Sequence, residues 1–341
     1  MSRAVLQPVI AVALVAALTG CLHSEKIESF GGPTMGSTYS VKYVQAEGVA
    51  PKAELQAATE AILAEIDEQM STYRSDSLIE VFNRSPSGSC QDMPEGVLDL
   101  VAAGNRLHEE SGGAFDLTLE PLLDLWGFGP KGQGEAVPSE QQLAEVRQRV
   151  GQQHLRIEDG KLCKDADIEV DFNSIAAGYA VDRIIARLGE LGVRSYLVEA
   201  TGELKAAGLK PDGKHWRIGL EEPRDDQRVA QRILQLDGYG ISTSGDYRNY
   251  FEEGGQRYSH TLDPMSGKPV NHTLAAVTVA DPSTLRADGL STLLMVLGPQ
   301  AGIAFAERNQ LAAFFVTREG DGFATYSTTE FEQLFAAGDE Q

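Results

Sequence analysis

Asp288 and Thr292 stand four residues apart in the segment ADGLSTLL. On a helix this spacing puts both side chains on one face, where their oxygen atoms could share a cation. Mg²⁺ is the natural candidate, because it takes hard oxygen ligands and leaves room for substrate phosphates. Asp288 could instead cap the N-terminus of the helix while Thr292 only packs, since Asp is a common N-cap residue. The spacing alone leaves both interpretations open.

His260 precedes a run of turn-forming residues that includes Asp263, Pro264, Gly267 and Pro269, and it comes directly after a possible strand. A turn can hold an imidazole in one tautomer and present it to a cleft. Near neutral pH such an imidazole can accept the proton of an attacking hydroxyl. The alternative is a structural histidine that is hydrogen-bonded inside the fold.

Tyr73 follows a helical segment in MSTYRSDSLIE, where its ring could stack on an aromatic ligand or simply pack at the helix end. Other groups with chemical potential lie in segments rich in Gly, Ser, Thr, Asp and His beside apolar elements. Functional groups tend to occupy such loops. The segments are 32–40, 112–122, 170–182 and the pair 259–270 and 287–294.

The elements that must position these groups are mixed along the chain. Apolar residues recur at helical spacing over residues 52–70, 95–110 and 176–191, and Gly112 and Gly192 are suitable stops. Short runs bounded by Gly, Pro or Asp predict strands at residues 39–44, 195–199, 216–220, 233–236, 275–279 and 312–317. Because helices and strands do not alternate regularly, we expect an α+β fold with antiparallel or mixed sheets.

The composition narrows the ligand classes. The formal net charge is −21, so the chain repels nucleic-acid phosphates rather than collecting them. An anionic small substrate would need a local cation, a helix N-terminus or a bound metal. The sequence has no P-loop and no GxGxxG after a strand, so any nucleotide or flavin must bind through another architecture.

The N-terminus has the pattern of an exported lipoprotein. Arg3 precedes an apolar run that is shorter than the roughly 20 residues a membrane-spanning helix needs. The run ends in Leu18, Thr19, Gly20 and Cys21, which match the lipobox of bacterial lipoproteins. We therefore expect a signal peptide at residues 1–20, a lipid on Cys21, a tether over 21–30 and a folded domain over 31–341. A periplasmic protein anchored to the inner or outer membrane follows.

Cys90 and Cys163 remain in the mature chain. An oxidising compartment permits a disulfide between them, and two buried free thiols are the alternative. Their spacing fits neither a metal site nor a CxxC motif, so neither cysteine has an expected catalytic role.

Seven segments, taken in order, resemble the ApbE family of FAD:protein FMN transferases. The resemblance covers about residues 31–308. It implies an ApbE-like (T-fold-like) arrangement of mixed sheets and packed helices, with FAD in a cleft between two intimate subdomains. The segments are TMGSTYS, MSTYRSDSLI, GGAFDLTLEPL, VDFNSIAAGYAVD, ISTSGDYRNYF, SHTLDPMSGKPV and ADGLSTLL.

The resemblance also implies roles for single residues. Mg²⁺ would be held by Asp288, Thr292 and the backbone carbonyl of Ser174, and His260 stands where the family has its proposed catalytic histidine. Ala177 occupies a position where the family commonly has Lys, so one contact to FAD would be weaker. The residues implied to line the FAD site are Met35, Tyr73, Ala114, Phe115, Asp116, Asp171, Ala177 and Leu262.

The implied reaction cleaves FAD, joins FMN through a phosphoester bond to a threonine of an acceptor protein, and releases AMP. Mg²⁺ on the pyrophosphate would supply the positive charge that the chain lacks. Acceptors of this family include subunits of ion-pumping redox complexes. Two alternatives remain: a Mg²⁺-dependent FAD pyrophosphatase that gives FMN and AMP, and a non-catalytic FAD-binding lipoprotein.

Overall fold

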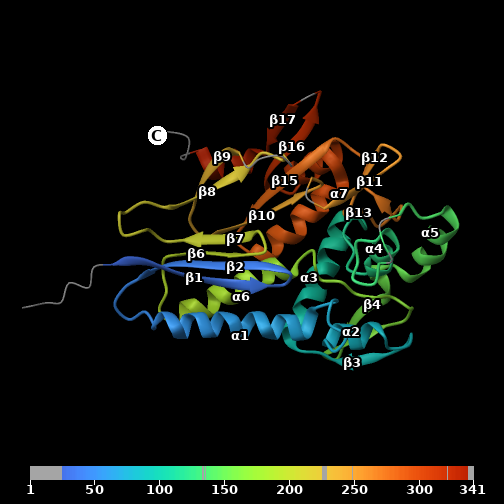
Figure 1. Ribbon diagram of the computed structural model, residues 1–341, viewed down its shortest axis with the longest axis horizontal. Helices are drawn as coiled ribbons and strands as arrows, with labels where there is room; N and C mark the ends of the chain where they lie inside the picture. Colours follow the sequence, from blue (N-terminus) through green and yellow to red (C-terminus); the bar gives the residue numbers. More distant parts are fainter. Residues whose placement is uncertain are drawn as a thin grey trace, which may run out of the picture.

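A computed structural model describes residues 25–132, 134, 136–224, 229–247, 249–320 and 322–336. At its centre lies an eight-stranded sheet in the order β1-β2-β6-β7-β10-β15-β16-β17 (Figure 1). Each neighbouring pair in this sheet is antiparallel. The strands are β1 Lys26–Thr34, β2 Ser37–Gln45, β6 Tyr196–Ala200, β7 Glu203–Ala207, β10 Tyr239–Gly245, β15 Leu274–Asp281, β16 Ala312–Glu319 and β17 Gly322–Ser327.

Four small antiparallel sheets surround the main one. They are β3 Cys90–Asp92 with β5 Lys161–Lys164 and β4 Leu155–Glu158; β8 Trp216–Glu221 with β9 Ala230–Leu236; β11 Tyr250–Glu253 with β12 Gln256–Ser259; and β13 Leu262–Asp263 with β14 Lys268–Pro269. The helices are α1 Lys52–Met70, α2 Leu78–Asn83, α3 Glu95–Ser111, α4 Glu120–Trp126, α5 Glu140–Val146, α6 Ala176–Glu190, α7 Thr284–Arg308 and α8 Thr329–Phe335, with short 3₁₀ turns at Arg147–Arg149 and Gln152–His154.

Two cores form on opposite faces of the main sheet. On one face α1, α3, α6 and α7 pack against strand residues such as Val41 and Tyr43, which are fully buried. On the other face β8, β9 and α8 cover Ile241 and Phe314. Burying one large apolar side chain contributes about 1.5 to 3 kcal/mol, so both layers hold the sheet in place.

A third core lies beside the main sheet. It joins α4, α5, β11 and β13 through Trp126, Phe251 and Leu262. The Trp126 indole N–H donates to the carbonyl of Gly267 at 2.9 Å, which fastens the turn between β13 and β14 to α4. This body therefore carries the segment that follows His260.

The three helices and six strands expected from periodicity are all present, within a few residues at their ends. The α+β prediction is confirmed, and of the two sheet types that it allowed, the described strand pairs of the named sheets have the antiparallel one. The tether expected over 21–30 is wrong from Lys26 onward. Residues 26–30 pair with β2, and Phe30 is buried in the first core because alternating side chains of the strand reach it.

The helix α7 carries Asp288 and Thr292, and it contains a kink at Gly298 and Pro299. Pro299 has no N–H to donate to the carbonyl of Met295 one turn earlier. The His272 ring takes over this role, since its Nε2 lies 2.8 Å from that carbonyl. By length and composition α7 could cross a membrane, but 61% of its most apolar stretch is buried inside the protein, as in a core helix.

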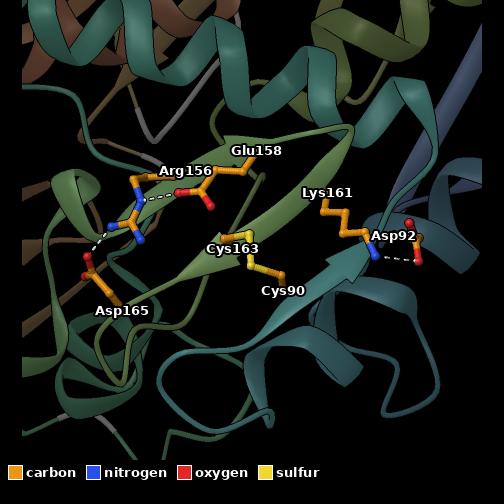
Figure 2. Close-up of a disulfide and its surroundings, with 7 residues drawn as sticks. All are labelled: Cys90, Asp92, Arg156, Glu158, Lys161, Cys163 and Asp165. Carbon is orange, nitrogen blue, oxygen red and sulfur yellow. Dashed lines mark hydrogen bonds and ion pairs between the residues drawn. A yellow bond between two sulfur atoms is a disulfide. The ribbon is translucent and has the colours of Figure 1, made fainter.

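Cys90 and Cys163 form a disulfide that joins β3 to β5, with the two Cα atoms 4.1 Å apart (Figure 2). They are direct partners in the antiparallel ladder. Of the two alternatives for these cysteines, the structure has the disulfide. Next to it, Lys164 is buried and donates to the carbonyls of Asn83 and Ile168 at 2.8 and 3.0 Å, so this small sheet is fixed to the end of α2.

Candidate active site

A cleft of about 830 Å³ lies between the main sheet, α7 and the third core. Segments that are far apart in the sequence meet in it, including every one of the polar segments that stand out in the sequence. Of the residues expected at the site, those that line the cleft are Ala114, Phe115, Asp116, Asp171, Ser174, His260, Leu262, Asp288 and Thr292.

Asp288 lies in this cleft with a second acid, Glu203 of β7. The Ser242 hydroxyl of β10 lies between them, 3.4 Å from the Asp288 carboxylate and 3.3 Å from the Glu203 carboxylate. A hydroxyl has one proton, so it can donate to one carboxylate at a time. The backbone N–H of Gly178 also donates to Asp288, at 2.9 Å. We call Asp288 and Glu203 the cleft pair.

The cleft pair is poorly neutralised. Burial, and then the charge of Glu203, raise the pKa of Asp288 well above its usual range. The groups that oppose this rise are the Gly178 amide and the Ser242 hydroxyl, and they include no cationic side chain of the described part of the chain. Burial also raises the pKa of Glu203. Two carboxyl groups held this way favour either a shared proton or a bound cation.

Asp288 is not the N-cap of α7, so the capping alternative is wrong. Ser283 is the N-cap, and its hydroxyl accepts from the backbone N–H of Arg286 at 3.3 Å. Asp182 of α6 adds acceptors for the backbone N–H groups of Thr284 and Leu285, each at 3.1 Å. The first backbone N–H groups of α7 thus have acceptors without Asp288. Asp288 stands in the second turn of the helix, where it faces the cleft.

The close contact between α6 and α7 depends on Gly178. A Cβ atom at this position would lie 2.4 Å from the carbonyl oxygen of Thr284, which no side chain tolerates. The glycine therefore lets α6 approach α7 closely enough for its N–H to reach Asp288. Ser174, in the turn before α6, consequently lines the same cleft as Asp288 and Thr292.

His260 lies on the side of the cleft that the third core forms, between β12 and β13. Its Nδ1 is 3.0 Å from the carbonyl oxygen of Asn249. A carbonyl only accepts, so Nδ1 must carry the hydrogen and Nε2 is left with a free lone pair. Phe128 contacts the ring edge-on, with centroids 6.4 Å apart. Burial lowers the pKa of His260, which keeps the imidazole neutral at neutral pH and therefore able to accept a proton.

Asp116 has a structural use in addition to its place in the cleft. One of its carboxylate oxygens accepts from the backbone N–H and the hydroxyl of Thr118, at 2.7 and 2.6 Å. The other accepts from the backbone N–H of Gln152 at 3.0 Å. Asp171 likewise accepts from the side-chain amide of Asn173 at 2.9 Å, and burial raises the pKa of Asp171 to about 6.

Three of the expected FAD-site residues do not line the cleft. Met35 is in the β1–β2 turn with a φ of 45°, and it packs against the first core. Ser37, two residues later, does line the cleft. Ala177 is buried in the first turn of α6. Tyr73 is 69% exposed; partial burial, and then the charge of Asp171, raise its pKa.

Residues that sequence reasoning missed complete the polar floor of the cleft. The Ser291 hydroxyl of α7 lies 3.1 Å from that of Ser242 and 2.8 Å from that of Ser244. A usable signal was present: Ser242 and Ser244 are two apart in a strand, so they face one side. Glu203 had no comparable signal, because only the pairing of β7 with β10 brings it to Asp288.

Comparison with known proteins decides the family. The model of the ApbE family matches residues 35–315. The chain belongs to the ApbE family. A curated relative from Vibrio cholerae, named FAD:protein FMN transferase, is 42% identical over 328 residues, which is 96% of this chain and 98% of the relative. An Escherichia coli protein of the same name is 36% identical and covers 92% of this chain and 91% of its own length.

Solved ApbE structures share the fold. The apo form of the Pseudomonas stutzeri flavinyl transferase ApbE superimposes with a TM-score of 0.88 at 63% identity, and covers 93% of this chain and 99% of its own. The Vibrio cholerae flavin transferase ApbE gives a TM-score of 0.85 at 40% identity, with 91% and 99% covered. The ApbE-like architecture expected from the sequence is therefore confirmed.

Proposed function

We propose that this ApbE-family protein is an FAD:protein FMN transferase that cleaves FAD, joins FMN to a threonine of an acceptor protein and releases AMP. The observation that carries the proposal is the pairing, in one cleft, of a neutral histidine whose Nε2 keeps its lone pair with an acid pair that has no cationic partner among the described residues. The relatives that bear the name FAD:protein FMN transferase match nearly the whole chain, which supports the same reaction.

The cleft pair suits a divalent cation. Asp288, Thr292 and the backbone carbonyl of Ser174 would hold Mg²⁺, and all three residues line the cleft and offer only oxygen donors. The repulsion between Asp288 and Glu203 gives the site an affinity for positive charge. When bound, the ion would supply the charge that stabilises the FAD pyrophosphate and the leaving AMP.

His260 acts as the general base. Its Nε2 takes the proton of the acceptor threonine hydroxyl while the threonine oxygen forms a bond to the FMN phosphorus. The bond from that phosphorus to the bridging oxygen of the pyrophosphate breaks, and the oxygen leaves with AMP. The Asn249 carbonyl holds the Nδ1 hydrogen, so the base keeps its tautomer during the proton transfer.

A transfer assay with His260→Ala tests this function. We expect single-turnover FMN transfer to slow by about 10² to 10⁴, while FAD binding and melting temperature change little. Flavin fluorescence that survives denaturing electrophoresis reports transfer, and free FMN and AMP report the pyrophosphatase alternative. His154→Ala is a matched control, since His154 pairs with Asp165 outside the cleft. Free FMN as the sole product of the wild type would replace the transferase with a pyrophosphatase, and FAD that never turns over would indicate a storage protein.

The protein is exported and anchored by lipid at Cys21. The support is the lipobox at residues 18–21 after an apolar run; these residues, and the signal peptide over 1–20, lie outside the described part of the chain. Its acceptors are then periplasmic or membrane-bound flavoproteins, such as subunits of ion-pumping redox complexes. Cys21→Ser should move the protein from the detergent phase to the aqueous phase and leave transfer intact. A variant that still partitions with detergent would exclude the anchor.

A further inference from the structure

Arg318 lies on β16, beyond residue 315, where the match to the family model ends. Its guanidinium donates two parallel hydrogen bonds to Asp246, at 2.7 and 2.6 Å. The Asp246 side chain is only 13% exposed and the Arg318 side chain 33%. A bidentate pair that is largely removed from water is stronger and better fixed in direction than an ordinary surface ion pair.

Asp246 precedes Asn249, the hydrogen-bond partner of His260, by three residues. Asp246 follows β10, and its N–H donates to the carbonyl of Ala275 at 3.2 Å. The Asn249 carbonyl accepts from His260 twice, from the backbone N–H at 3.1 Å and from Nδ1 at 3.0 Å. The carbonyl that fixes the imidazole therefore belongs to a residue close in the chain to the one that Arg318 holds.

Arg318 is itself fixed at the other end. Its backbone N–H donates to the carbonyl of Thr273 at 2.8 Å, just before β15. The ion pair thus connects β16 to the residue that directly follows β10. The Asp246 charge also acts on His260 directly, because it opposes the fall in the His260 pKa that burial causes.

We propose that Arg318 is a positioning residue for the flavin-transfer reaction, which sets the orientation and the basicity of His260 through Asp246. This role rests on the proposed function, in which His260 is the base. Arg318 acts in two ways. Its two hydrogen bonds fix Asp246, three residues before the Asn249 carbonyl, and its charge offsets that of Asp246, so that Asp246 cannot make the imidazole too easily protonated.

The charged surroundings of His260 are simple in the described part of the chain. Asp246 is the charge that shifts its pKa, and its other close partners, Asn249 and Phe128, are uncharged. His272 is a second reporter of the same pair. Burial lowers its pKa, Asp246 raises it and Arg318 lowers it. The two charges of the pair therefore act on nearby histidines in opposite directions.

The test uses Asp246→Asn and Arg318→Met in the full chain. Asp246→Asn removes a negative charge, so the His260 titration midpoint should fall. Arg318→Met leaves Asp246 uncompensated, so the midpoint should rise. We expect each to move by about 0.5 to 1 pH unit, which gives Arg318→Met a 3- to 10-fold slower transfer on the acid side of the profile. Arg318→Lys keeps the charge and should leave the midpoint near that of the wild type.

Titration of the histidine ring carbons by NMR measures the midpoint without any turnover, with the His260 signal assigned by its loss in His260→Ala. Glu332→Gln is the matched control, because it also neutralises the acid of a bidentate arginine pair, with Arg232, but on α8. It should leave the midpoint unchanged.

Midpoints that stay constant, or move in one direction in both variants, would overturn the proposal. Opposite shifts in a protein that transfers no FMN would refute the proposed function and leave the coupling standing. If Arg318→Met fails to fold, Asp246→Asn and Arg318→Lys decide between these outcomes.

Discussion

Two groups of carboxylates, one lining the cleft and one outside its lining, solve the same electrostatic problem differently. One is the cleft pair, Asp288 and Glu203, whose close partners are hydroxyls and a backbone amide. The other, which we call the lysine-bridged cluster, gathers three acids around one ammonium group. Lys131 Nζ lies 2.7 Å from Glu120, 2.9 Å from Glu169 and 3.4 Å from Glu80.

The difference shows which group is built for an external cation. The lysine-bridged cluster carries its own positive charge, and the Asn83 amide adds hydrogen bonds to Glu80 and Glu120 at 3.1 and 3.0 Å. It needs no ligand in order to be stable. Among the described residues the cleft pair has no such charge, so the buried Asp288 is left without a cationic partner, which is costly unless a cation or a proton binds.

The largest expected effect comes from Asp288→Asn. Flavin transfer should fall by on the order of 10³-fold, because the charge that holds the metal is lost. In the absence of metal the melting temperature should rise, since removing one acid relieves the repulsion with Glu203. Thermal scans with and without Mg²⁺, together with transfer rates, measure both changes.

Asp99→Asn is the control for this variant, because Asp99 is an exposed acid on α3. It should alter neither the rate nor the response to Mg²⁺. A metal-free Asp288→Asn protein that is less stable than the wild type would mean that Asp288 is a structural residue. It would also remove the distinction between the two acid groups.

The next largest effect concerns the disulfide, which is linked to the lysine-bridged cluster. Cys163 precedes Lys164, and Lys164 donates to the carbonyl of Asn83, whose amide serves the cluster. Replacing Cys90 and Cys163 together by Ser should lower the free energy of unfolding by about 2 to 4 kcal/mol. Denaturant unfolding measures this loss. The stabilisation of the variant by Mg²⁺ should equal that of the wild type, and a reduced Mg²⁺ response would show that the two groups of carboxylates are coupled.

Much of the fold could be predicted because the signals are local. Helical periodicity predicted α1 to the residue, and Gly112 marked the end of α3 with a φ of 65°. The strands with continuous apolar character, such as β15 and β16, were equally visible. The missed strands β1, β7 and β10 contain glycines or alternating polar residues, and only their neighbours in the sheet stabilise them as strands.

Site residues that lie close together in the sequence could be predicted. Residues that meet only through the fold, from distant parts of the chain, were missed. Asp288 and Thr292 share one helix, so their spacing predicted their common face. Glu203 reaches Asp288 through strand pairing, and Arg318 reaches Asp246 across more than seventy positions, for which sequence periodicity has no signal. The lysine-bridged cluster is similar, because its members come from α2, α4 and two loops.

A smaller effect should follow from Lys131→Met. The variant leaves Glu120 buried without its cation, so the free energy of unfolding should fall by about 1 to 2 kcal/mol. The loss is modest because Lys131 is 45% exposed and Glu120 can take up a proton. Lys161→Met is a close control, since Lys161 is also 45% exposed but its partner Asp92 is 88% exposed. Similar losses in both variants would show that the cluster contributes no more than a surface pair.

The last effect is a pH dependence that belongs to Glu120. Burial raises the pKa of Glu120 to about 8, against 4.5 for an ordinary glutamate, although Lys131 opposes the rise. The folded protein thus binds a proton that the unfolded chain releases between about pH 4.5 and 8. The contribution of this group is complete below pH 4.5 and is lost as the pH rises toward 8.

Glu120→Gln removes that slope, so the stability of the variant relative to the wild type should increase steadily between pH 5 and 8. Urea unfolding at both pH values measures it. Glu332→Gln serves as the control, since Arg232 lowers the pKa of Glu332 to about 2 and that acid is ionised throughout this range. If Glu120→Gln loses relative stability as the pH rises, Glu120 is ionised in the folded protein, and the lysine-bridged cluster then contains more uncompensated charge than the cleft pair.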